Sequence, residues 1–263
     1  MSDVADWWST AIIDMEPGRI DLRGEPIQDL IGNLGFAEMI WFMVRGDKPS
    51  PAQLKLFEAA LVAAVDHGPQ APSIATARMA VTCGLPLNNA MASAVNMLGD
   101  IHGGAGEQAV TLYHFAASHS SNLEVAMDEW IALNGKILPG FGHRFHTPTD
   151  PRAPRLMALV DEAIANEACD GRFKAVAREI ESELARRKGK PVPMNIDGAT
   201  AVIYAELGFA APLARGLFCL SRSVGILAHA WEQTQQGGRN KGPTPPKYRW
   251  TYLNAETLGS VDQ

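Results

Sequence analysis

Two histidines and one aspartate, each close to glycine, have the types and spacing that could carry out chemistry in this chain. His102 lies in the segment GDIHGGA, His143 in LPGFGHR and Asp197 in PMNIDG. Glycine lets the backbone come close to a ligand, and carboxylates and imidazoles commonly transfer protons in enzymes. Each motif by itself also has a structural interpretation, as a helix cap or a turn. Together the three side chains suit proton transfer at a carbon atom beside a carbonyl group.

The order of four motifs along the chain, HGGA, PGFGHR, DPR and NxDG, resembles the citrate synthase superfamily. The NIDG form, together with DHGP at residues 66–69, is similar to the members that cleave citryl-CoA, including the lyase module of ATP-citrate lyase. The resemblance covers most of the chain, about residues 30–233. There are two departures. This chain keeps His102, which that lyase module lacks, and a PKYRW segment stands where citrate synthases have a C-terminal Arg-Pro pair.

The resemblance implies a role for each of the three residues. His102 donates to the oxygen of the enolate beside the thioester, where negative charge develops. Asp197 transfers the proton at the α-carbon. In the cleavage direction His143 takes the hydroxyl proton of citryl-CoA as the C–C bond breaks, and Asp197 protonates the methylene. The same residues run a Claisen condensation in reverse, so the motifs leave the direction open.

Substrate binding is expected from one histidine and two arginines. By the resemblance, His67, Arg152 and Arg222 contact the acid. Arginine suits carboxylates because its planar guanidinium binds them through two N–H groups at once. Arg222 lies in an apolar helical stretch, where an unpaired cation is costly, so an internal ion pair is the alternative. For coenzyme A, the resemblance assigns the loop before His143 and one basic side chain: Leu138, Pro139, Gly140, Phe141, Gly142 and Arg144.

The sequence predicts no metal site and no permanently bound cofactor, so coenzyme A enters as part of the substrate. His143 and His146 lie three residues apart in a glycine-rich loop, and His114 and His119 lie five apart. Helical zinc pairs favour a spacing of four residues, which places both rings on one face. No third ligand stands at a spacing typical of zinc sites.

Composition excludes several classes of protein. The chain has 263 residues, 46% of them hydrophobic and 20% charged, which is typical of a globular protein. A formal net charge of −6 argues against nucleic acid as a partner. The N-terminus has no leader pattern, and no apolar run approaches the ~18 residues of a membrane span. With Cys83 and Cys219 expected as buried free thiols, we expect a cytoplasmic protein.

Helical periodicity dominates the chain. Ser50, Pro51 and Gln53 predict an N-cap, a first helical residue and a capping box, and we expect the helix that they start to stop at Gly68. Alternating strand patterns are nearly absent, so the fold class is all-α. Further helices are expected over residues 72–84, 88–99, 106–118, 123–134, 152–167, 172–187, 197–207 and 212–236.

Enzymes that this chain resembles have a large helical domain with a smaller helical domain inserted in its sequence. By that resemblance residues 1–103 and 214–263 form the large domain, and residues 104–213 form the small one. The family also implies a homodimer, for which small residues along the helix faces permit close packing.

The expected function is cleavage of citryl-CoA to acetyl-CoA and oxaloacetate. One alternative is a short citrate or 2-methylcitrate synthase, which condenses an acyl-CoA with an oxoacid. Another, of a different class, is a catalytically silent helical subunit that binds CoA esters. Loss of one of the three residues would have favoured the silent subunit, and His102, Asp197 and His143 are all present.

Overall fold

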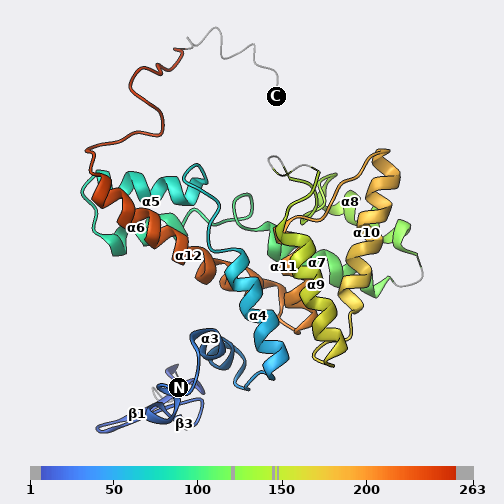
Figure 1. Ribbon diagram of the computed structural model, residues 1–263, viewed down its shortest axis with the longest axis horizontal. Helices are drawn as coiled ribbons and strands as arrows, with labels where there is room; N and C mark the ends of the chain where they lie inside the picture. The colour runs from blue at the N-terminus through green and yellow to red at the C-terminus, as the bar shows by residue number, and fades with distance from the viewer. Residues whose placement is uncertain (1–6, 120–121, 144–145, 147, 253–263) are drawn as a thin grey trace. The chain divides into compact units, whose positions relative to one another are not determined.

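The computed structural model describes residues 7–119, 122–143, 146 and 148–252 (Figure 1). Helices make up 59% of it, which confirms the all-α prediction. Near the N-terminus, β1 (Ile13–Glu16), β2 (Arg19–Leu22) and β3 (Glu25–Pro26) form a small antiparallel sheet in that order. The helices of the described residues are α2 (Ile27–Leu30), α3 (Phe36–Arg45), α4 (Pro51–Ala63), α5 (Pro72–Thr82), α6 (Leu87–Val95), α7 (Ala105–Ser118), α8 (Leu123–Asn134), α9 (Arg152–Ala165), α10 (Arg172–Lys188), α11 (Ile196–Glu206) and α12 (Ala211–Gln236).

The predicted helices are present, most with ends within about two residues of the expected positions. The capping box at the start of α4 is confirmed, because the Ser50 hydroxyl accepts from the Gln53 N–H and the Gln53 side chain accepts from the Ser50 N–H. Two helices end earlier than expected, α4 at Ala63 and α6 at Val95. The small sheet, α2 and α3 were not predicted from the sequence.

The chain divides into two compact units. The first contains Met1–Asp66 and Leu98–Arg222, and the second contains His67–Met97 and Ser223–Gln263. The predicted division into a large domain of residues 1–103 and 214–263 and a small inserted domain of residues 104–213 stays a prediction.

Helix α11 lies at the centre of the first unit, where it packs against α4, α7, α9 and α10 (Figure 1). Its sequence IDGATAVIYAE is apolar on every side, and residues 198–205 are all buried. A helix that is hydrophobic all round belongs inside a core. Neighbouring helices therefore surround the helix that carries Asp197, and its first turn is held by them.

The second unit has a core of small and β-branched side chains from α5, α6 and the end of α12, including Ile74, Ala90 and Ile226. Arg78 on α5 donates to Glu232 and Gln236 on α12, each at 2.6 Å.

The three cysteines are free, but the predicted burial of Cys83 is wrong. Cys83 is exposed because α5 ends at Thr82, so its apolar neighbours do not enclose it. By length and composition alone, α12 is the one helix of the described residues that could cross a membrane, with a mean hydropathy of 1.2. Core helices of soluble proteins pass the same test. The absence of a membrane partner therefore stays a prediction.

Candidate active site

Asp197 is the second residue of α11, and the sequence before it forms the helix cap. The Asn195 side-chain oxygen accepts from the N–H groups of Asp197 at 2.9 Å and Gly198 at 3.1 Å. Asparagine is among the preferred N-cap residues because it satisfies amides that have no partner inside the helix. The NIDG motif is therefore a helix start that places the Asp197 carboxyl in the first, positively polarised turn.

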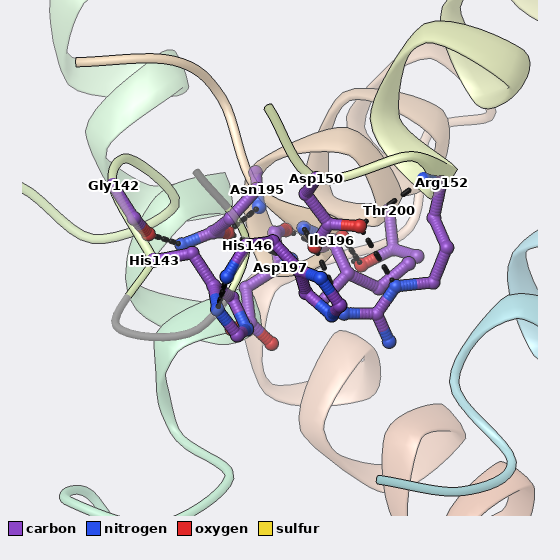
Figure 2. A network of polar contacts seen from close by, with 10 residues as sticks. Gly142, His143, His146, Asp150, Arg152, Asn195, Ile196, Asp197 and Thr200 are labelled. Carbon is purple, nitrogen blue, oxygen red and sulfur yellow. Dashed lines mark hydrogen bonds and ion pairs between the residues drawn. The ribbon is translucent and has the colours of Figure 1, made fainter. Parts of the chain in front are cut away.

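The glycine loop before His143 is bonded to the segment before α11 (Figure 2). Gly142 N–H donates to the Pro193 carbonyl at 2.8 Å, and Asn195 N–H donates to the Gly140 carbonyl at 3.0 Å. The Asn195 side chain also donates to the Gly142 carbonyl at 2.7 Å. Asn195 thus joins the loop that carries His143 to the helix that carries Asp197.

Two glycines allow this close approach. A Cβ atom at Gly140 would lie 2.7 Å from the Gly198 Cα, and one at Gly198 would lie 2.3 Å from the Gly140 carbonyl oxygen. Gly140 also has a positive φ of 88°, which side chains other than glycine rarely adopt. On the other side, the buried Tyr113 hydroxyl on α7 donates to the Gly198 carbonyl at 3.2 Å. The glycine of NIDG is therefore required by packing against the Gly140 loop.

His143 is oriented by its own loop. Its Nδ1 accepts from the His146 backbone N–H at 3.0 Å, and the two imidazole rings lie 4.5 Å apart (Figure 2). A neutral imidazole has one N–H group, so acceptance at Nδ1 places the proton on Nε2. In this arrangement His143 is a hydrogen-bond donor. Arg144, the basic side chain predicted for coenzyme A, lies outside the described residues.

His102 lies in a tight turn just before α7. A Cβ at Gly104 would lie 2.6 Å from the Asp100 carbonyl oxygen, so the second glycine of HGGA is required by the turn. Gln108 donates to that same carbonyl at 3.1 Å. Burial, and then the Arg222 charge, lower the pKa of His102. A neutral imidazole at neutral pH can donate a hydrogen bond to a developing oxyanion.

The two predicted arginines have different partners. Arg152 forms a bidentate ion pair with Asp150, through Nε at 3.0 Å and Nη2 at 2.8 Å. Arg222 on α12 is 5% exposed, donates from Nε to the Ala64 carbonyl at 3.1 Å, and lies 4.8 Å from the centre of the Phe218 ring. Burial lowers the pKa of Arg222, while the charges of Asp66 and Asp197 raise it. An anionic ligand would relieve the cost of burying this cation.

The electrostatics of Asp197 reflect these neighbours. Burial raises the pKa of its carboxyl, the positive charges of Arg152 and Arg222 oppose that rise, and the negative charge of Asp150 adds to it. The net effect is a raised pKa, which favours the protonated form. A protonated carboxyl beside two arginines can deliver a proton to a carbanion next to a bound carboxylate.

The structure brings most of the predicted site together. His102, His143, Asp197, Arg152 and Arg222 all belong to the first unit. The charge of Arg222 acts on both Asp197 and His102, and Figure 2 shows His143, Asp197 and Arg152 in one polar network.

His67 belongs to the second unit, so its contact with the substrate stays a prediction. In the predicted coenzyme A loop, Leu138 and Phe141 are buried in the core of the first unit. Contact of this loop, including Pro139, Gly140 and Gly142, with coenzyme A stays a prediction. Within the described residues, no group of three or more potential metal ligands was found.

Asp150 and Asn195 were not predicted from the sequence as parts of the site. Both stand inside the motifs, in DPR and NIDG, which was the available signal. Their bonds reach 46 and 53 residues along the chain, to Ile196 and Gly142, and motif spacing does not reveal such pairings.

Comparison with known proteins agrees with the fold and the motifs. The family described as citrate synthase, C-terminal domain, matches residues 19–243, and the chain therefore belongs to the citrate synthase family. It is 32% identical over 213 residues to a citrate synthase of Heyndrickxia coagulans, which covers 80% of this chain and 55% of the relative. With the citrate synthase of Haloferax volcanii the identity is 29% over 215 residues, 80% of this chain and 55% of that one. The chain spans about half the length of the curated relatives it matches.

Among solved structures, citryl-CoA lyase from Hydrogenobacter thermophilus is similar with a TM-score of 0.85 and 31% identity. The match covers 94% of this chain and 95% of that one. ATP citrate lyase from Methanothrix soehngenii, in complex with citrate and coenzyme A, has a TM-score of 0.80 over 95% of this chain and 42% of that one. Its identity of 21% indicates a shared fold alone.

Proposed function

We propose that this protein cleaves citryl-CoA to acetyl-CoA and oxaloacetate. One observation carries the proposal: the chain matches a citryl-CoA lyase over nearly the whole of both chains, at 31% identity. Against the relatives named citrate synthase, it covers only about half of the other protein. Burial raises the pKa of Asp197, which favours the protonated form that the cleavage step needs at the α-carbon.

In the proposed mechanism, Arg152 and Arg222 bind carboxylates of the citryl group. The C–C bond breaks as the hydroxyl proton passes to Nε2 of His143, and the bonding electrons form the enolate of acetyl-CoA. His102 donates to the enolate oxygen, where the charge develops. Asp197 then protonates the methylene carbon, which gives the acetyl methyl group.

His143 has one role toward the citryl-CoA substrate and another toward the oxaloacetate product. With the proton on Nε2, as its bond from His146 requires, it donates to the carbonyl oxygen of the oxaloacetate product. To accept the citryl hydroxyl proton at Nε2, the ring needs the other tautomer, with the His146 bond broken. We therefore expect the hydrogen bond from the His146 N–H to His143 Nδ1 to break and form again during each turnover.

A second candidate function is condensation by a short citrate or 2-methylcitrate synthase. The observation that favours it is the identity of 29–32% to relatives named citrate synthase. A protein named citrate/2-methylcitrate synthase, from Bacillus subtilis, is 30% identical over 217 residues.

Two incubations of the purified protein decide between these functions. In the first, citryl-CoA is the substrate and oxaloacetate is detected by its reduction to malate. In the second, acetyl-CoA and oxaloacetate are supplied, and free coenzyme A thiol and citrate are measured. Faster cleavage than citrate release supports the lyase, and citrate with free coenzyme A as the main products would replace it with the synthase. Absence of turnover in both would leave a CoA-ester-binding subunit.

We also propose that the active form is a homodimer. On α12 of the second unit, Val224, Leu227 and Trp231 are 59%, 41% and 56% exposed at helical spacing. An apolar stripe of this kind is typical of an interface. Light scattering at the assay concentration checks the proposal, and a fully active monomer would contradict it.

A further inference from the structure

The carboxylate of Asp150 lies directly before α9 and is 1% exposed. Its Oδ1 accepts from the backbone N–H of Arg152 at 3.1 Å and from Arg152 Nε at 3.0 Å. Its Oδ2 accepts from Arg152 Nη2 at 2.8 Å and from the Ile196 N–H at 3.1 Å. Each oxygen thus accepts two hydrogen bonds, and the four donors come from two segments that are far apart in the sequence (Figure 2).

We infer that Asp150 is a positioning residue that fixes Arg152, the proposed carboxylate anchor, relative to Asp197, the proposed acid. The inference rests on the proposed function for the roles of those two groups. Its geometric part stands on the contacts alone, because one carboxylate binds the arginine and the residue next to Asp197 at the same time.

The contact with Ile196 completes the cap of α11. The first amides of a helix have no partner within the helix. Asn195 satisfies those of Asp197 and Gly198, and Asp150 satisfies that of Ile196. The start of α11 therefore cannot rotate without breaking a bond to a buried, charged acceptor.

The contact with Arg152 orients the guanidinium. The pair uses the edge formed by Nε and Nη2, so the Nη1 end takes no part in it. The guanidinium is planar, so fixing one edge fixes the direction in which the other end donates. A substrate carboxylate bound there is held at a set distance from the first turn of α11.

Asp150 also contributes to the electrostatics of the acid. Among the described residues, the charged and titratable groups that interact with Asp197 are Arg152 from α9, Arg222 from α12, Tyr113 from α7 and Asp150 itself. Replacing Asp150 by asparagine removes a negative charge and leaves the charge of Arg152 uncompensated. Both changes lower the pKa of Asp197. Cleavage needs protonated Asp197, so the loss of activity with rising pH moves to lower pH.

The test compares Asp150→Asn with Glu206→Gln as a matched control. Glu206 is a carboxylate of intermediate burial that, like Asp150, caps a helix. It accepts from the N–H groups of Gly171 at 3.0 Å and Lys174 at 2.9 Å, and these contacts include none of the site residues given above. We expect Asp150→Asn to lower kcat/KM for citryl-CoA about tenfold to a hundredfold, the range for hydrogen bonds to charged groups. The high-pH fall in activity should also move to lower pH. Glu206→Gln should change neither kcat/KM nor the pH at which activity falls, even if it lowers the melting temperature as much as Asp150→Asn does.

Asp150→Glu separates charge from position and carries the test if Asp150→Asn does not fold. It keeps the negative charge but moves it by one methylene, so KM should rise while the pH profile stays in place. Two results would overturn the inference: an Asp150→Asn variant whose pH profile and KM match those of Glu206→Gln, or an Asp150→Glu variant with unchanged KM.

A readout without turnover separates this inference from the proposed function. If the unaltered protein does not act on citryl-CoA, the proposed function fails. Hydrogen exchange at the Ile196 amide then decides the geometric claim. Exchange that is at least tenfold faster in Asp150→Asn than in Glu206→Gln supports it, and equal exchange in the two variants overturns it.

Discussion

Replacing Gly198 by alanine tests whether backbone contact between the two glycine motifs holds the site together. The new Cβ would lie 2.3 Å from the Gly140 carbonyl oxygen and 2.9 Å from the Met194 Cγ. Met194 is a flexible side chain, but Gly140 is backbone and its carbonyl also accepts from the Asn195 N–H. The clash therefore forces the loop away from α11.

Two effects of opposite sign set the magnitude. Alanine is favoured over glycine inside a helix by up to about 1 kcal/mol. Overpacking that moves backbone costs about 1–3 kcal/mol, and the added methyl group also threatens the bond between Gly140 and Asn195. The clash outweighs the propensity, because the atoms in contact cannot change rotamer. We expect a net loss of about 1–2 kcal/mol, which for a chain of this size lowers the melting temperature by several degrees.

The matched control is Gly216→Ala on α12, where an added Cβ has nothing within 4 Å. At that position alanine changes only the helix propensity and causes no clash. The free energy of unfolding should therefore stay the same or rise by up to about 1 kcal/mol. Calorimetry measures both variants, and the citryl-CoA assay follows activity. Displacement of the acid by about 1 Å can cost about 100-fold in rate, so Gly198→Ala should be strongly impaired. The reasoning is refuted if Gly198→Ala melts as high as Gly216→Ala and keeps activity within a few-fold.

Three further predictions follow from the site and the fold. Asp197→Asn should lower turnover by about 10²–10⁴-fold while circular dichroism and coenzyme A binding stay unchanged; activity within a few-fold of the parent would exclude Asp197 as the acid. Burial raises the pKa of Asp197, so cleavage should persist to higher pH than an ordinary aspartate allows and fall above that pKa, and a rate profile that rises there would contradict protonated Asp197 as the donor. Ser50→Ala breaks the capping box of α4 and should lower the free energy of unfolding, measured with urea, by about 1 kcal/mol. An unchanged urea midpoint would show that the cap does not stabilise the fold.

The sequence by itself determined most of the helices, from α4 onward, and the groups that can do chemistry. Helix ends depend on neighbours within four residues, so Ser50 and Gln53 could be identified as a capping box without any tertiary information. The order of the glycine, histidine and aspartate motifs was likewise enough to indicate the family. Alternation alone did not reveal the short N-terminal sheet, because its strands have four, four and two residues.

Only the tertiary structure decided how these groups act. Whether Asp197 is protonated depends on its burial and on charges from two other segments, residues 150–152 and α12. The tautomer of His143 depends on a backbone N–H in its own loop. The sequence around Asp150 predicts only the start of a helix. In the structure its carboxylate accepts from the backbone N–H of Ile196, 46 residues further along the chain. The sequence pattern shows which side chains are present and how they repeat along a helix or strand. Desolvation and hydrogen-bond partners arise only when distant segments pack together, and they set proton affinity and orientation.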